Sequence, residues 1–109
     1  MATSTGHAAI YAIMLTLAAC GDELISSSCI YGGAINLLSN TMARSGIKTT
    51  FVHPTDLAGF EAAITEKTKV IFAEAVGNPS CDVTDIDALA EIAHRHGIPL
   101  VIDNTFPTP

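Results

Sequence analysis

The stretch Pro99-Leu100-Val101-Ile102-Asp103-Asn104-Thr105 decides the fold class of this chain. Its apolar residues predict a buried strand, and Asp103 places a carboxylate where that strand leaves the core. In open α/β sheets, ligands bind at the carboxyl ends of the strands, and a single Asp there typically meets a cation, a metal or a protonated ring nitrogen. We expect the residues that complete such a site to lie beyond Pro109 or on another chain.

Helical and strand patterns alternate along the rest of the sequence. Ser4 or Thr5 can cap a first helix that continues to Ala19 and that is apolar on nearly every face, which predicts a central, buried helix. Periodicity and turn residues predict further helices over 33–45, 56–64 and 85–96, and strands over 23–27, 47–52, 69–75 and 98–103. This alternation predicts an α/β fold with three layers, in which a mostly parallel sheet carries helices on both faces.

Composition limits the classes of protein that the chain can belong to. The sequence has 109 residues, of which 49% are hydrophobic, enough for one globular domain or part of one. Its net charge is -6 and its five basic residues are scattered, so nucleic acid is not an expected partner. No basic region precedes the first apolar stretch, and no apolar run is long enough to cross a membrane. We therefore expect a cytoplasmic protein without a membrane partner.

The cysteines and histidines suggest no metal site. Cys20, Cys29 and Cys81 are odd in number and lack metal-ligand spacing, so we expect reduced and mostly buried thiols. His94 and His96 are two positions apart on a predicted helix and do not face each other. Their position in its last turn favours an interaction with the helix dipole.

Polar residues follow several elements at the same predicted edge of the sheet. Gly6 and His7 open the first helix, where free N–H groups and the helix dipole can hold a phosphate, although any well-capped helix begins in this way. Tyr31 follows the first strand beside two glycines and offers either a ring for stacking or a packed surface ring. Glu74 and Asn78 follow the third strand, where Asn78 could also be a simple turn residue.

A ligand that matches this set carries a phosphate, a flat ring and a basic ring nitrogen, and pyridoxal phosphate has all three. The sequence also resembles the Cys/Met-metabolism enzymes that depend on pyridoxal phosphate. The resemblance rests on Ser-Thr-Gly-His-Ala-Ala (4–9), Ser-x-x-x-Tyr-Gly-Gly (27–33), Glu-Ala-Val-Gly-Asn-Pro (74–79) and Val-Ile-Asp-Asn-Thr-Phe-Pro-Thr-Pro (101–109), and it spans nearly the whole chain.

The resemblance implies a role for each of these residues in binding the cofactor. The roles are backbone contacts of Gly6 and His7 to the phosphate, stacking of Tyr31 on the ring, approach of Asn78 to the ring hydroxyl, pairing of Asp103 with the pyridine nitrogen, and support from Thr105 and Glu74. A carboxylate beside that nitrogen favours the protonated ring, which is the better electron sink.

The resemblance also implies parts that these residues do not include. The family's Schiff-base lysine follows the Asp-Asn-Thr signature, and Lys48, Lys67 and Lys69 are expected at the opposite edge of the sheet. The family's amino-terminal arm and carboxy-terminal domain are also missing. We therefore expect 1–109 to be part of the large, cofactor-binding domain of a fold-type I enzyme and to be inactive alone. The parent protein is expected to be a homotetramer built from dimers.

The residues before Asn78 suggest a subgroup. Val76 and Gly77 are similar to the sulfhydrylase pattern, whereas γ-lyases usually have Pro two residues before that Asn, and His7 departs from both. The implied reaction is γ-replacement, in which O-acetylhomoserine and sulfide or a thiol give homocysteine or methionine. A γ-lyase or a cystathionine γ-synthase is the alternative within the family. A non-catalytic or metal-dependent α/β domain is the alternative from another class.

Overall fold

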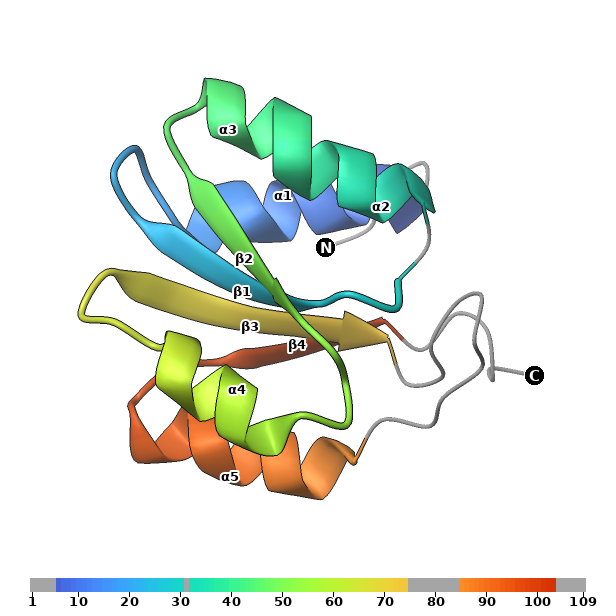
Figure 1. Ribbon diagram of the computed structural model, residues 1–109. Coiled ribbons are helices and arrows are strands. Elements are labelled where there is room, and N and C mark those ends of the chain that lie inside the picture. Colours follow the sequence, from blue (N-terminus) through green and yellow to red (C-terminus); the bar gives the residue numbers. More distant parts are fainter. Residues whose placement is uncertain (1–5, 31, 75–84, 104–109) are drawn as a thin grey trace.

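The computed structural model describes residues 6–30, 32–74 and 85–103, in which helices and strands alternate along the chain (Figure 1). The helical elements are α1 (Gly6–Leu17), α2 (Gly32–Asn36), the π-helical turn η1 (Leu37–Thr41), α3 (Met42–Arg44), α4 (Leu57–Ala63) and α5 (Ile86–Arg95). The strands are β1 (Glu23–Ser27), β2 (Lys48–Val52), β3 (Thr68–Glu74) and β4 (Leu100–Asp103). Each predicted helix and strand is present, with bounds that differ by a few residues at most.

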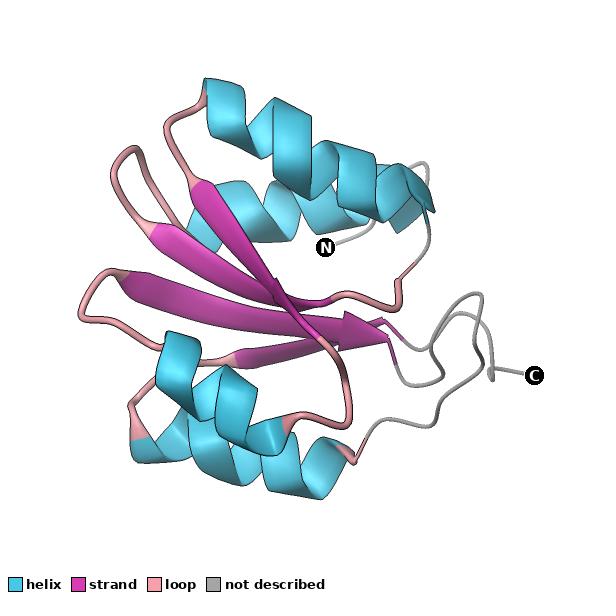
Figure 2. Cartoon of the chain, in the orientation of Figure 1, coloured by secondary structure: helices cyan, strands magenta, loops and turns pink. Residues whose placement is uncertain are grey.

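The four strands form one sheet in the order β2-β1-β3-β4, and every neighbouring pair is parallel. The helices α1, α2 and α3 cover one face, and α4 and α5 cover the other (Figures 1 and 2). The predicted three-layer fold is therefore confirmed. The strand order places β1 and β3 in the centre of the sheet, and these two strands are the most buried of the four.

Side chains alternate between the two faces and build two cores. Val70 and Phe72 of β3 join the core under α1, α2 and α3, while Ile71 and Ala73 join the core under α4 and α5. This alternation is the two-residue period of a strand, and burial on both sides is typical of a parallel sheet. The position of each β3 side chain is therefore fixed by its place in this alternation.

Glycine ends two helices just before the strands that they feed. Gly46 and Gly97 have φ values of 77° and 68°, a left-handed backbone that favours glycine. After Gly97, the N–H of Ile98 donates to the carbonyl of Ala93 at 2.9 Å, which satisfies a carbonyl at the helix end. Ile47 and Ile98 follow these glycines and are buried, so each helix end also anchors the next strand.

Two expectations about burial are wrong. Leu15 on α1 is 44% exposed, so this helix is not buried on all sides: among the described residues, its outer face has no covering element. An apolar composition allows a helix to be buried. Whether the helix is buried depends on the elements that pack around it. Cys20 is exposed and Cys29 is half-buried, both as free thiols, while Cys81 lies outside the described residues.

Candidate functional site

The carboxyl ends of β3 and β4 bring two carboxylates to one place. Glu74 is the last residue of β3 and Asp103 the last of β4, and the two are paired in register across the parallel ladder. Glu74 is buried, with 8% of its surface exposed, and Asp103 is half-buried. The predicted placement of both residues at strand ends is confirmed. The sequence did not predict that Glu74 and Asp103 would be partners in register on neighbouring strands.

Both carboxylates belong to the face that α1, α2 and α3 cover. Phe72 of β3 and Val101 of β4 are themselves paired in register and pack in the core of that face. Glu74 and Asp103 each come two residues later, so the alternation of a strand returns them to the same side. The face therefore changes from apolar to acidic at its carboxyl end.

Helix α1 begins at the same edge of the sheet. It runs opposite to the strands and feeds the amino end of β1, so Gly6 and His7 lie where β3 and β4 end (Figure 1). Helix α2, which starts at Gly32, also begins at this edge. The first turns of helices present N–H groups without partners in the helix and the positive end of the dipole, which suit a phosphate.

The connection from β1 to α2 is shaped by Ser27, which belongs to the Ser-x-x-x-Tyr-Gly-Gly motif but received no role of its own from the sequence, and by Ile30. Ser27 is fully buried, and its hydroxyl accepts a hydrogen bond from the N–H of Cys29 at 3.2 Å. Ile30 is buried in the core of the α1 face. The signal in the sequence is the run of serines at 26–28, because a serine at a strand end often bonds to the backbone of the turn that follows.

Three of the predicted site residues lie outside the described residues. They are Tyr31, Asn78 and Thr105. Their proposed roles rest on the sequence alone, whereas those of Gly6, His7, Glu74 and Asp103 can be compared with the fold.

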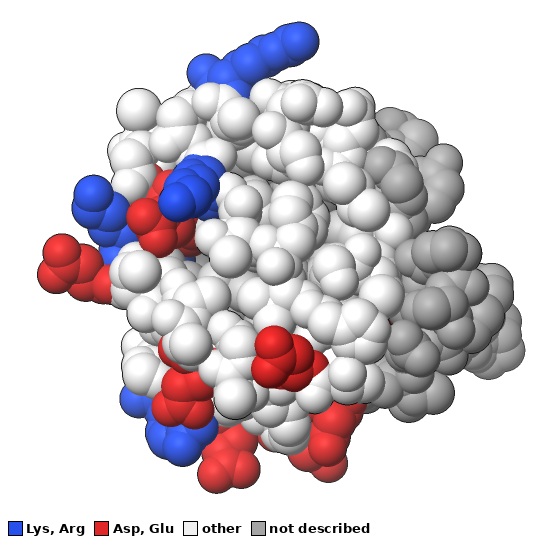
Figure 3. Space-filling model, viewed as in Figure 1, with Lys and Arg blue, Asp and Glu red and all other residues white. Residues whose placement is uncertain are grey.

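The lysines lie at the opposite edge of the sheet, as predicted. Lys48 is the first residue of β2, Lys67 comes just before β3, and Lys69 is the second residue of β3 rather than a residue before the strand. On the face that Figure 3 shows, most basic side chains lie singly beside acidic ones. None of the three lysines is placed near Glu74 or Asp103.

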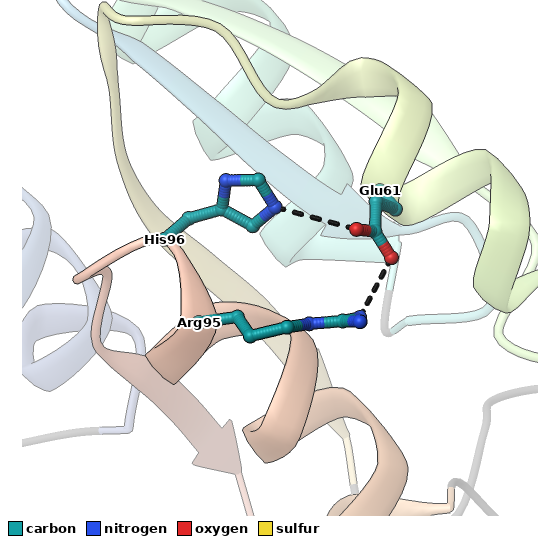
Figure 4. Close-up of polar contacts among 3 residues, drawn as sticks. All are labelled: Glu61, Arg95 and His96. Atoms are coloured by element: carbon teal, nitrogen blue, oxygen red, sulfur yellow. Dashed lines mark hydrogen bonds and ion pairs between the residues drawn. The ribbon is translucent and has the colours of Figure 1, made fainter.

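A second polar cluster joins α4 to α5, away from the carboxylates. Glu61 accepts a hydrogen bond from Arg95 at 2.7 Å, and its other oxygen lies 3.5 Å from Nε2 of His96 (Figure 4). These side chains are substantially exposed, so they form a surface contact between helices rather than a binding cavity. His96 therefore meets a carboxylate of another helix in addition to the end of its own.

Two other features are absent from the described parts of the chain, a metal-binding cluster and a membrane-spanning helix. Across 6–30, 32–74 and 85–103, no group of three or more His, Cys, Asp or Glu side chains could hold a metal ion. None of the helices in these ranges is long and apolar enough to cross a membrane.

Comparison with known proteins defines the class to which this fold and site belong. Residues 1–109 match the family described as Cys/Met metabolism PLP-dependent enzyme, where PLP is pyridoxal phosphate. The chain belongs to this family. The predicted resemblance, the fold class and the cofactor of the family are thereby confirmed.

Particular relatives narrow the comparison further. The chain is 44% identical to the homocysteine synthase of Schizosaccharomyces pombe over 106 residues, which is 97% of this chain and 25% of the relative. It is 42% identical to the O-acetyl-L-homoserine sulfhydrylase of Leptospira meyeri over 109 residues, 100% of this chain and 25% of the relative. The chain thus spans about a quarter of the length of these relatives.

Solved structures include members of two subgroups. The O-acetylhomoserine sulfhydrylase of Wolinella succinogenes is similar with a TM-score of 0.89 and 39% identity, over 93% of this chain and 29% of that chain. The cystathionine gamma-lyase of Lactobacillus plantarum, complexed with L-serine, gives a TM-score of 0.92 and 40% identity, over 97% and 28%. The shared fold therefore does not separate sulfhydrylases from γ-lyases.

Proposed function

We propose that the complete protein that carries these residues binds pyridoxal phosphate and catalyses γ-replacement on O-acetylhomoserine. Sulfide or a thiol would replace acetate, which gives homocysteine or methionine. The observation that carries the cofactor proposal is the placement of Asp103, Glu74 and the start of α1 at one edge of the sheet. The substrate proposal is supported by relatives named homocysteine synthase and O-acetyl-L-homoserine sulfhydrylase.

The residues at this edge fit the chemistry of the cofactor. We assign the backbone at Gly6 and His7 to the phosphate, and the Asp103 carboxylate to the pyridine nitrogen, where a negative charge holds a proton on the ring. The assignment extends, from the sequence, to Tyr31 on the ring, Asn78 at the ring hydroxyl and Thr105 in support of Asp103. When bound, the cofactor supplies the electron sink for a substrate carbanion.

The proposal extends to the domain organisation and the assembly of the complete protein. We propose that 1–109 is part of the large, cofactor-binding domain and that the Schiff-base lysine lies in a segment beyond these residues. We also propose a cytoplasmic homotetramer built from dimers. Size-exclusion chromatography with light scattering on the complete protein measures its assembly.

Substrate assays on the complete protein test the reaction. With pyridoxal phosphate, O-acetylhomoserine and sulfide, we expect homocysteine and acetate in equal amounts. Cystathionine is the matched second substrate, because the similarity to a cystathionine gamma-lyase makes γ-elimination the specific competing activity. Release of an α-keto acid and ammonia from cystathionine, without homocysteine from O-acetylhomoserine, would assign the protein to the γ-lyases instead.

A further inference from the structure

A second pocket lies at the amino edge of the sheet, on the face that α4 and α5 cover. Its volume is about 460 Å³, which is within the range of small-molecule sites. It is lined by the turn that follows α4, by the start of β3 and by residues 96–98 after α5. The pocket is therefore at the end of the sheet opposite to Glu74 and Asp103.

The lining of this pocket combines both signs of charge with an apolar part. Lys69 and Glu66 line it and are exposed, and His96 lines it from the end of α5. Ile64 and Ile98 supply the apolar part and belong to the core under α4 and α5. Figure 3 shows acidic and basic side chains side by side at this edge, on the left of the view. A ligand that carries a single charge would be repelled by one part of this lining.

An extra residue in β3 redirects the side chain of Lys69. Glu23 of β1 pairs with Thr68, and Leu24 pairs with Val70, so the pairing of the two strands passes over Lys69. Such a bulge bends the strand and re-aims the side chain at that position, and bulges are frequent beside functional sites. Lys69 is exposed between two buried residues, so it remains available to a ligand in the pocket that it lines.

Hydrogen bonds of two threonines hold the turn between α4 and β3. Thr68 Oγ1 accepts a hydrogen bond from the N–H of Thr65 at 2.9 Å. Thr65 Oγ1 accepts one from the N–H of Lys67 at 3.1 Å and donates one to Glu23 Oε1 at 2.8 Å. The turn that carries Glu66 is thus formed by its own side chains, which lowers the cost of ordering it around a ligand.

The end of α5 borders the pocket on the side of His96. His96 contacts Glu61, but neither Glu61 nor Arg95 lines the pocket, so the surface contact between the helices and the pocket are separate features that share His96. The carbonyl end of a helix is the negative end of its dipole and favours a positively charged group. An ammonium group is therefore favoured beside α5.

We propose that this pocket binds a free α-amino acid with an uncharged, apolar side chain. We assign the α-carboxylate to Lys69, the α-ammonium group to Glu66 and the carbonyl end of α5, and the side chain to Ile64 and Ile98. An α-amino acid carries both charges only a few bonds apart, so it matches both parts of the lining, whereas a carboxylic acid or an amine matches one. This inference goes beyond the proposed function and does not rest on it.

Isothermal titration calorimetry on the complete protein tests the class of ligand. The cofactor is left out, so that only binding to the protein's own residues is measured. The probe is L-norleucine, and its matched comparisons are hexanoate, which lacks the ammonium group, and 1-aminopentane, which lacks the carboxylate. Norleucine should bind with a dissociation constant in the millimolar range or below, about tenfold or more below those of the comparisons. A protein that does not bind norleucine, or that binds either comparison equally well, would overturn the proposal.

Substitutions test the location of the site. Lys69→Gln and Glu66→Gln should each raise the dissociation constant of norleucine about tenfold or more, the scale of one lost hydrogen bond between charged groups. Lys67→Gln and Glu91→Gln are the matched controls, because these residues are exposed and do not line the pocket, and affinity should stay within about twofold. Unchanged affinity in either pocket variant, or an equal loss in the controls, would overturn the assignment. A protein that binds norleucine in this way but makes no homocysteine would support the pocket and reject the proposed function.

Discussion

Asp103 occupies the last position of β4, where it pairs in register with Glu74 of β3, and it is half-buried. This position leaves the carboxylate accessible to a ligand at the edge of the sheet while its backbone is held by pairing with β3. A carboxylate held in this way can keep a fixed distance to a bound ring, which is what protonation of a ring nitrogen requires.

Replacing Asp103 by Asn in the complete protein should lower turnover much more than cofactor content. The amide keeps the shape but removes the charge, so the ring nitrogen loses its proton near neutral pH. We expect turnover to fall about a hundredfold or more, the scale of an interaction that is strongest in the transition state. Cofactor absorbance and turnover, measured on the same preparation, check this expectation.

Asp87→Asn is the control for the loss of one negative charge. Asp87 is exposed in the first turn of α5, on the face of the sheet opposite to that of Asp103, so its replacement should leave turnover unchanged. An Asp103→Asn variant with full cofactor and a normal rate would mean that Asp103 has no role at the ring.

At the residue scale, the sequence predicted where each carboxylate lies but not that they are neighbours. Apolar runs that end in Glu74 and Asp103 identify two strand ends, because this signal is local. Their pairing in register depends on β3 and β4 being adjacent in the order β2-β1-β3-β4. Strand order is decided by how the helices pack over the sheet, and no local pattern encodes it.

At the scale of elements, helix ends were predicted well and helix interiors less well. Asp56 and Asp85 cap α4 and α5 by accepting hydrogen bonds from N–H groups three residues later, at 2.9 and 3.0 Å. The π-helical turn at Leu37–Thr41 was not predicted, since the sequence pattern over 33–45 is that of one continuous helix. Thr49 of β2 donates to the carbonyl of Leu38 at 3.3 Å, a contact that depends on tertiary packing.

Substitutions at Gly97 should separate backbone conformation from packing. Its φ is 68°, and a Cβ at this position would meet nothing within 4 Å, so only the left-handed backbone penalises a side chain. Stability should decrease in the order Gly, Asn, Ala, Val, with a loss of about 1 kcal/mol for Ala. Asn should lose least because it adopts this conformation more readily, and Val most because it is β-branched.

Urea unfolding of the complete protein without cofactor gives the free energies for this series. The exposed residue Ala62 on α4, replaced by Asn and by Val, is the control for helix propensity and hydrophobicity at an ordinary backbone position. If Gly97→Val were as stable as Gly97→Asn, the helix end would not be held in the left-handed conformation.

At the scale of the whole molecule, the described residues leave β2 and β4 with one strand neighbour each and α1 with an exposed apolar side chain. Open strand edges and apolar surface favour association between chains. The 109-residue chain, produced alone, should therefore be a mixture of associated species rather than a monodisperse monomer.

Light scattering at several protein concentrations measures this association. Leu15→Gln on α1 and Ile86→Gln on α5 should each reduce the apparent mass, because Leu15 is 44% exposed and Ile86 is 39% exposed. A monomer that unfolds cooperatively would show instead that these residues form a complete domain.

Main-chain hydrogen bonds hold both edges of the sheet: at the carboxyl edge, Ser28 N–H donates to the carbonyl of Val52 at 2.8 Å. At the amino edge, main-chain groups of separate loops bind one another: Gly21 N–H donates to the carbonyl of Gly46 at 2.9 Å, and Glu23 N–H donates to that of Lys67 at 2.9 Å. Such bonds survive most changes of side chain, whereas the carboxylates at the ends of β3 and β4 are lost with theirs. During evolution, segments held by main-chain bonds can accumulate neutral substitutions, while mutations of the carboxylates alter chemistry, so one scaffold can diverge in activity without losing its fold.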